Sequence, residues 1–166
     1  MYLFKSILVA AAVSVLCGTA TLSAVELPPN DYDGPPISFF ANLSADEESA
    51  VTESPGTGRV DFVLERKPMR VSWKGTYSGL TSEALGIHVH GPQTPGGEAG
   101  IMFDLAPNGI KNSFEGSTVI NDGQLEYLLT SRFYVNLHTT KYKAGELRGT
   151  VRRLPPKAPN GSQVTQ

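Results

Sequence analysis

The sequence predicts an all-β protein, folded as an antiparallel sandwich or a Greek-key barrel. Apolar and polar residues alternate over short segments, as in strands that bury one face. Glycine and proline, with 17 and 12 residues in a chain of 166, separate these segments. Because apolar residues do not recur with the helical period of 3.6, we expect little helix.

Seven or eight short strands are expected. Residues 58–65 show the pattern most clearly, with Val60, Phe62 and Leu64 on one face. Residues 91–100 read as a loop rich in glycine and proline, and at most one helical turn is expected, at residues 82–85. The expected strands are Ile37–Leu43, Gly58–Glu65, Met69–Tyr77, Leu85–His90, Gly116–Ile120, Leu125–Thr130, Arg132–Thr139 and Glu146–Arg152.

Residues 1–24 are typical of a secretory signal peptide. Lys5 supplies a positive charge before the apolar run 6–16, and small residues follow that run. The run is short for a bilayer, and an uncleaved signal that anchors the chain in the membrane is the alternative. Cys17, the only cysteine, would leave with the signal, so the mature protein would have neither a disulfide nor a thiolate ligand. The predicted location is secreted or periplasmic.

The folded domain is expected to span residues 37–154. Proline and polar residues make 25–36 a flexible lead-in and 155–166 a disordered tail. The formal net charge of −2 gives no support for nucleic-acid binding. Charges on residues 58–65, interpreted as an edge strand, would discourage sheet-to-sheet association, so we expect a monomer or a weak dimer.

The three histidines of the chain are predicted to bind one metal ion. His88 and His90 are two residues apart on a strand, so they share a face and lie roughly 6.5–7 Å apart along it. His138 shares the polar face of its strand with Tyr134 and Asn136. Were the two strands neighbours, the three imidazoles would converge on the outside of the sandwich. Three unrelated surface or hydrogen-bonded histidines are the alternative.

Copper is the expected metal, and zinc is the less favoured alternative. Imidazoles without thiolates suit both ions. Met102 is a soft thioether near the His-x-His segment and is a possible further ligand, or else a core residue. The candidates for orienting the imidazoles through hydrogen bonds are Asn136, Glu146 and Asp104.

Several segments together resemble the CHRD domain, the module named after chordin. The resemblance covers residues 38–152 and implies an immunoglobulin-like β-sandwich, without a settled biochemical activity. The segments that carry it are Phe40–Ser44, Gly56–Val60, Tyr77–Leu80, Ile87–Pro92, Tyr134–Thr139 and Gly145–Gly149.

A weaker resemblance is to copper–zinc superoxide dismutase, which also carries His-Val-His on one strand and a later Val-His segment. It implies copper ligands at His88, His90 and His138, a superoxide-dismutase-like fold, and an active-site arginine at Arg148. A fourth copper-binding histidine, the zinc-binding histidines and the paired cysteines of that family are absent from this chain. Arg148 therefore has two interpretations: a cation that draws an anion to the metal, or a structural partner of Glu146 or of a loop carboxylate.

Three functions remain open. The first is an exported copper-binding protein that sequesters copper or passes it on through the three-histidine site. The second is a copper-only enzyme similar to superoxide dismutase. The third is a non-catalytic extracellular module that binds a protein partner, which the sequence does not name.

Overall fold

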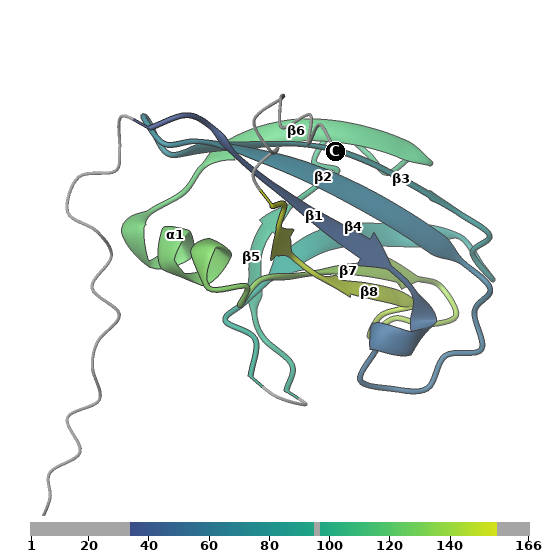
Figure 1. Cartoon of the computed structure of the whole chain (residues 1–166). Helices are drawn as coiled ribbons and strands as arrows, with labels where there is room; N and C mark the ends of the chain where they lie inside the picture. Colours follow the sequence, from purple (N-terminus) through teal and green to yellow (C-terminus); the bar gives the residue numbers. More distant parts are fainter. Residues whose placement is uncertain (1–33, 95–96, 156–166) are drawn as a thin grey trace, which may run out of the picture.

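The chain folds into two antiparallel β-sheets that face each other across an apolar core (Figure 1). This is a computed structural model that describes residues 34–94 and 97–155. One sheet has the strand order β6-β3-β2-β1-β9 and the other the order β5-β4-β7-β8. The prediction of an all-β sandwich is confirmed. The strands are β1 (Ile37–Leu43), β2 (Thr57–Glu65), β3 (Arg70–Ser78), β4 (Ala84–His90), β5 (Ile101–Asp104), β6 (Ser113–Val119), β7 (Tyr134–Thr139), β8 (Leu147–Thr150) and β9 (Arg152–Arg153).

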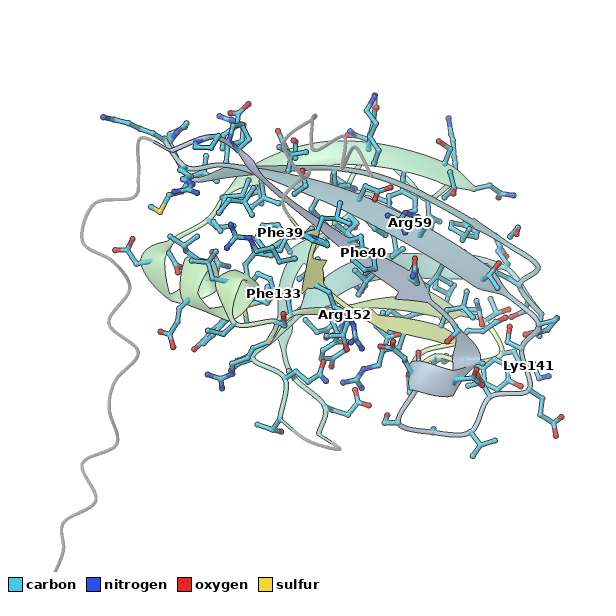
Figure 2. All side chains as sticks on the ribbon, in the orientation of Figure 1. Phe39, Phe40, Arg59, Phe133, Lys141 and Arg152 are labelled. Carbon is cyan, nitrogen blue, oxygen red and sulfur yellow. The ribbon has the colours of Figure 1, made fainter. Side chains whose placement is uncertain are left out.

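The core forms from the inward-facing residues of both sheets. Along β1, buried residues alternate with more exposed ones, as the sequence pattern predicts. Phe39 from this strand and Phe133, just before β7, are almost completely buried and lie between the sheets (Figure 2). Removing such apolar area from water is the main stabilising contribution in a domain of this size.

One predicted strand is a helix. Residues 125–130, interpreted as a strand, belong largely to helix α1 (Asp122–Leu129), which lies at one end of the sandwich (Figure 1). The helix begins at a capping box: the Asn121 side chain accepts the backbone N–H of Gln124, and the Gln124 side chain accepts that of Asn121. Leu128 then reaches the core. The short apolar run fits both the two-residue period of a strand and the 3.6-residue period of a helix, and the capping box favours the helix.

Three smaller expectations were wrong. The turn expected at residues 82–85 is not helical, because β4 already begins at Ala84. Strand β5 was not anticipated, and it begins directly after the expected loop. Strand β2, interpreted as an edge strand, lies inside its sheet between β1 and β3, so the argument from its charges to a monomer or weak dimer falls away. A short 3₁₀ helix, η2 (Ala45–Glu47), follows β1.

The expected signal peptide, residues 1–24, lies outside the described residues. So do residues 25–33 of the lead-in 25–36 and residues 156–166 of the tail 155–166. Within residues 34–94 and 97–155, no helix has the length and apolar character needed to cross a membrane.

A buried carboxylate ties three connecting segments to the second sheet. Glu146 is fully buried and accepts four hydrogen bonds. They come from the Ser54 hydroxyl at 2.6 Å, the Thr81 N–H and hydroxyl at 2.7 and 3.0 Å, and the Thr139 hydroxyl at 2.6 Å. Burial by itself would raise the pKa of Glu146, but these hydrogen bonds outweigh it and lower the pKa below the usual 4.5.

Replacement of this carboxylate should destabilise the fold. Glu146→Gln puts an amide donor among groups that themselves donate, and we expect the free energy of unfolding at pH 7 to fall by about 1–3 kcal/mol. Because the folded-state pKa is depressed, this contribution is present above pH 4.5 and is lost as the pH falls through the folded-state value. Urea denaturation at pH 7 and at pH 3 measures both effects.

The matched control is Glu115→Gln, which removes an exposed ion pair with Lys74 at 3.3 Å. It should change stability by less than about 0.5 kcal/mol. Equal losses in the two variants at pH 7 would contradict the role of Glu146.

Candidate metal centre

The pairing of β4 with β7 brings the three histidines onto one face. The two strands are hydrogen-bonded neighbours, with Gly86 opposite His138 and His88 opposite Asn136. Residues directly opposite each other in an antiparallel pair point to the same side of the sheet. His88, His90 and His138 therefore share the outer face of the four-stranded sheet, away from the apolar core.

The imidazoles form a compact triangle. The ring centroids lie 5.9 Å apart for His88 and His90, 5.1 Å for His88 and His138, and 5.7 Å for His90 and His138. One nitrogen from each ring lies within 4.8 Å of one from each other ring. An ion about 2 Å from each nitrogen needs separations of roughly 3–4 Å, so small side-chain rotations close the site.

Backbone carbonyls determine which nitrogen carries the proton in two of the rings. His90 Nδ1 lies 2.9 Å from the Ala99 oxygen, and His138 Nδ1 lies 3.0 Å from the Lys143 oxygen. A carbonyl oxygen only accepts hydrogen bonds, so Nδ1 is the donor in each ring. This leaves Nε2 of His90 and of His138 as the nitrogens with a free lone pair when the rings are neutral.

The free nitrogens are buried without partners. His88 Nδ1, His90 Nε2 and His138 Nε2 have no hydrogen-bond partner within the described part of the chain and almost no contact with solvent. Buried polar atoms are nearly always paired, so three orphaned nitrogens on neighbouring rings need an explanation. A shared metal ion provides one, since it would bond to the lone pair of each.

His88 and His138 are held in the neutral form that metals bind. Burial lowers the pKa of His88 below 6.5, against the opposing charge of Asp104. Burial likewise lowers the pKa of His138, and the neighbouring imidazoles add to this effect. Both rings therefore carry no charge near neutral pH, and each has a nitrogen lone pair for an ion that prefers imidazole ligands.

Gly86 makes room for the His88 ring. A methyl group at this position would lie 2.9 Å from Cε1 and 3.1 Å from Nε2 of that ring. The absence of a side chain two residues before His88 therefore sets where the imidazole rests.

Of the other predicted site residues, Asn136 and Asp104 lie beside the histidines, whereas Glu146 and Met102 have other partners. Asn136 is fully buried and donates to the Ala144 oxygen at 3.1 Å, next to the carbonyl that holds His138. Asp104 pairs with His88 across the strands and acts on it through its charge. Glu146 serves the loop junction described above. Met102 places its sulfur 3.9 Å from the side-chain amide of Gln124 and packs with the core.

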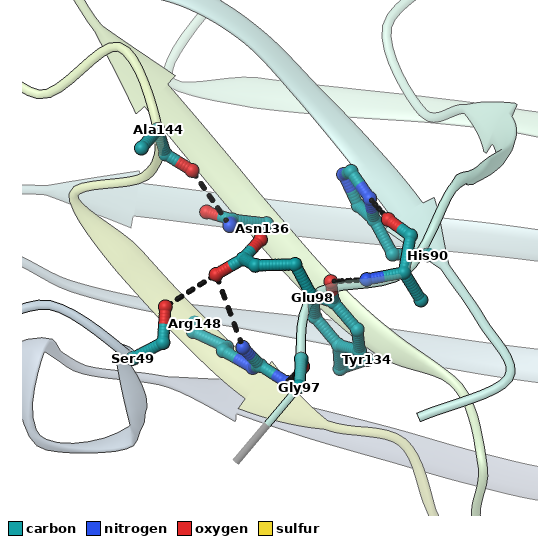
Figure 3. A network of polar contacts seen from close by, with 9 residues as sticks. Ser49, His90, Gly97, Glu98, Tyr134, Asn136, Ala144 and Arg148 are labelled. Carbon is teal, nitrogen blue, oxygen red and sulfur yellow. Dashed lines mark hydrogen bonds and ion pairs between the residues drawn. The ribbon is translucent and has the colours of Figure 1, made fainter. Parts of the chain in front are cut away.

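Arg148 belongs to a polar layer beside the histidines (Figure 3). Its guanidinium lies 3.6 Å from the centre of the Tyr134 ring, 3.9 Å from the Glu98 carboxylate and 3.4 Å from the Gly97 oxygen. Ser49 donates to the same carboxylate, which links two loops over the sheet. Arg148 is 6% exposed, and its partner is thus a loop carboxylate rather than Glu146.

This layer corrects the expected exposure of the outer face. Tyr134 and Asn136 were assigned to the polar face of β7, and both are fully buried under the loops. The sequence predicts which way these two side chains point, because they alternate with core residues. It does not predict that loops bury them. The contributions of Glu98, Ala99 and Lys143 were missed, since two of the three act through backbone oxygens that any residue possesses.

Glu48 is the strained member of this layer. Burial raises its pKa from 4.5 to about 7, with Glu98 adding to the rise and Arg148 opposing it. Its Oε1 has no hydrogen-bond partner in the described chain, and neither has the Asn136 oxygen. Both oxygens crowd the same side of Gly145, whose φ of +150° and missing side chain permit this approach.

A family model described as the CHRD domain matches residues 39–151 of the chain. Comparison with curated proteins and with solved structures gave no match.

Neutralising Glu48 should stabilise the protein in a pH-dependent manner. The carboxyl has a folded-state pKa of about 7 against 4.5 when unfolded, so ionisation penalises the fold as the pH rises from 4.5 to 7. Glu48→Gln removes that penalty, and we expect a gain of about 1–3 kcal/mol at pH 8 and little gain at pH 4. Urea denaturation at both pH values measures it.

Glu53→Gln, on an exposed residue of the same loop, is the control, and it should leave the free energy of unfolding unchanged at both pH values. A Glu48→Gln variant no more stable than the parent at pH 8 would contradict the cost of ionising Glu48 in its half-buried position.

Proposed function

The chain belongs to the CHRD domain family, and we propose that this member is an exported copper-binding protein that sequesters copper or passes it on. One observation carries the proposal: three imidazoles on adjacent strands converge, with one buried and unpartnered nitrogen in each. The predicted signal peptide supports export. His88, His90 and His138 would hold the ion.

The ligand set supports copper over zinc. Imidazole nitrogens suit both ions. A structural zinc site is closed by four protein ligands, whereas the cluster in the described residues contains three histidines and no carboxylate or thiolate; zinc would need a water as its fourth ligand here. Zinc is therefore the competitor to include in a titration.

Burial of the free nitrogens supports sequestration or transfer over catalysis. A catalytic metal needs a position open to water or substrate, whereas these nitrogens have almost no access to solvent. Arg148 is engaged by Glu98, Gly97 and Tyr134, so its positive charge already has partners. Redox turnover of copper at this site is the weaker alternative.

Copper titration of the mature protein tests the proposal. We expect one copper ion per chain, and each of His88→Ala, His90→Ala and His138→Ala should weaken binding by at least about tenfold, because each removes one of three ligands. Competition against a chromophoric copper chelator measures the affinity, with zinc as the competing ion.

Met102→Leu is the matched control, because its sulfur packs beside Gln124 and its loss should leave the affinity unchanged. Copper binding that survives replacement of all three histidines would refute the site. A folded parent that binds no copper would refute the copper proposal and favour the alternative of a non-catalytic module that binds a protein partner.

Gly86→Ala should weaken the site without removing a ligand. The new methyl group would press on the His88 ring, and we expect the domain to fold while copper affinity falls about tenfold. The same substitution at Gly123 in α1, where the added carbon would lie 3.5 Å from the Asn121 oxygen, an ordinary contact distance, is the control. Unchanged affinity in Gly86→Ala would show that the position of the His88 ring does not matter.

A further inference from the structure

Tyr134 and His90 are joined through a single backbone unit. The Ala99 N–H donates to the Tyr134 hydroxyl at 3.0 Å, and the Ala99 oxygen accepts from His90 Nδ1 at 2.9 Å. Figure 3 shows Tyr134 and His90 on either side of this segment, with both contacts marked. Residues 97–100, here termed the strap, thus connect the phenol to the imidazole.

The two side chains are also in direct contact. Tyr134 and His90 lie opposite each other on β7 and β4. Their rings stack nearly parallel, with centroids 5.1 Å apart and an interplanar angle of 13°. The phenol therefore limits the tilt of the imidazole, while the strap limits its rotation within its own plane.

Apart from the His90 bond itself, the Tyr134 hydroxyl makes the shortest hydrogen bond between the strap and the sheet in the described part of the chain. Arg148 reaches the strap at 3.4 Å from the Gly97 oxygen and 3.9 Å from the Glu98 carboxylate, longer than the hydrogen bond to Ala99. The Ala99 bond also acts on the residue whose carbonyl holds His90. Loss of the hydroxyl would therefore release that carbonyl first.

We propose that Tyr134 is a positioning residue for His90. Its hydroxyl fixes the strap so that the Ala99 carbonyl keeps the imidazole proton on Nδ1 and turns Nε2 toward the other two histidines. The consequence for copper rests on the proposed function, whereas the control of the His90 tautomer does not. An interaction of this kind, which orients a ligand, typically changes metal affinity by 10–100-fold.

Tyr134→Phe tests the proposal, because it keeps the ring and the stacking and removes the hydroxyl alone. The measurement is nitrogen NMR of the metal-free mature protein with labelled histidine, which reports the tautomer of each ring. We expect His90 to be protonated at Nδ1 in the parent and to become a mixture of tautomers in the variant. His138 should keep its tautomer, because the Lys143 carbonyl holds it independently.

Tyr142→Phe is the matched control. Its hydroxyl also accepts a backbone N–H, that of Glu53 at 3.3 Å, but on a different loop. We expect the His90 tautomer and the copper affinity to match the parent in this variant, and copper affinity to fall about tenfold in Tyr134→Phe.

The two proposals fail in different ways. A His90 ring that stays fully protonated at Nδ1 in Tyr134→Phe would overturn the positioning role, even in a parent that binds copper. A parent that binds no copper would refute the copper site, while a tautomer change in Tyr134→Phe would still support the role of Tyr134.

Discussion

The antiparallel pairing of β4 with β7 is the constraint on which the site depends. Its register places His88 opposite Asn136 and His90 opposite Tyr134, so every second residue of both strands faces outward. A shift by one residue would send the imidazoles into the core and the core residues Ile87 and Val89 out to the loops. Burial of those apolar side chains therefore fixes the register, and through it the convergence of the histidines.

A second constraint is that buried polar groups need partners. Glu146 meets it with four donors and stabilises the junction of three segments. The loops over the four-stranded sheet meet it in part, through Arg148, Glu98 and the backbone oxygens that hold two imidazoles. The three histidine nitrogens are exceptions, as are Glu48 Oε1 and Asn136 Oδ1 beside them, and a cluster of such exceptions is typical of a site that binds a ligand.

Stability and the proposed function are opposed in this layer. Glu48 is buried without a partner for one oxygen, and Gly145 adopts a backbone conformation that side chains disfavour. Both features bring the loops down over the sheet beside the histidines. Burial of this kind keeps His88 and His138 neutral, which is the form that a metal requires.

Local sequence patterns predicted the strands that bury one face. The strand Ile37–Leu43 was predicted with its observed bounds, because apolar alternation and the flanking proline define it. Residues 125–130 were assigned to a strand because a short apolar run fits two periods, and the reciprocal cap between Asn121 and Gln124 chooses the helix. Strand β5 was not predicted because it is only four residues long and is defined by its pairing with β4.

The sequence by itself determined that the protein is all-β and that its three histidines face away from the core, since both follow from a two-residue period. Only the tertiary structure decided that β4 and β7 are neighbours, that loops bury Tyr134 and Asn136, and that Ala99 and Lys143 orient the imidazoles. These contacts join residues far apart along the chain or use backbone oxygens, which every residue carries, so they cannot be predicted from residue type.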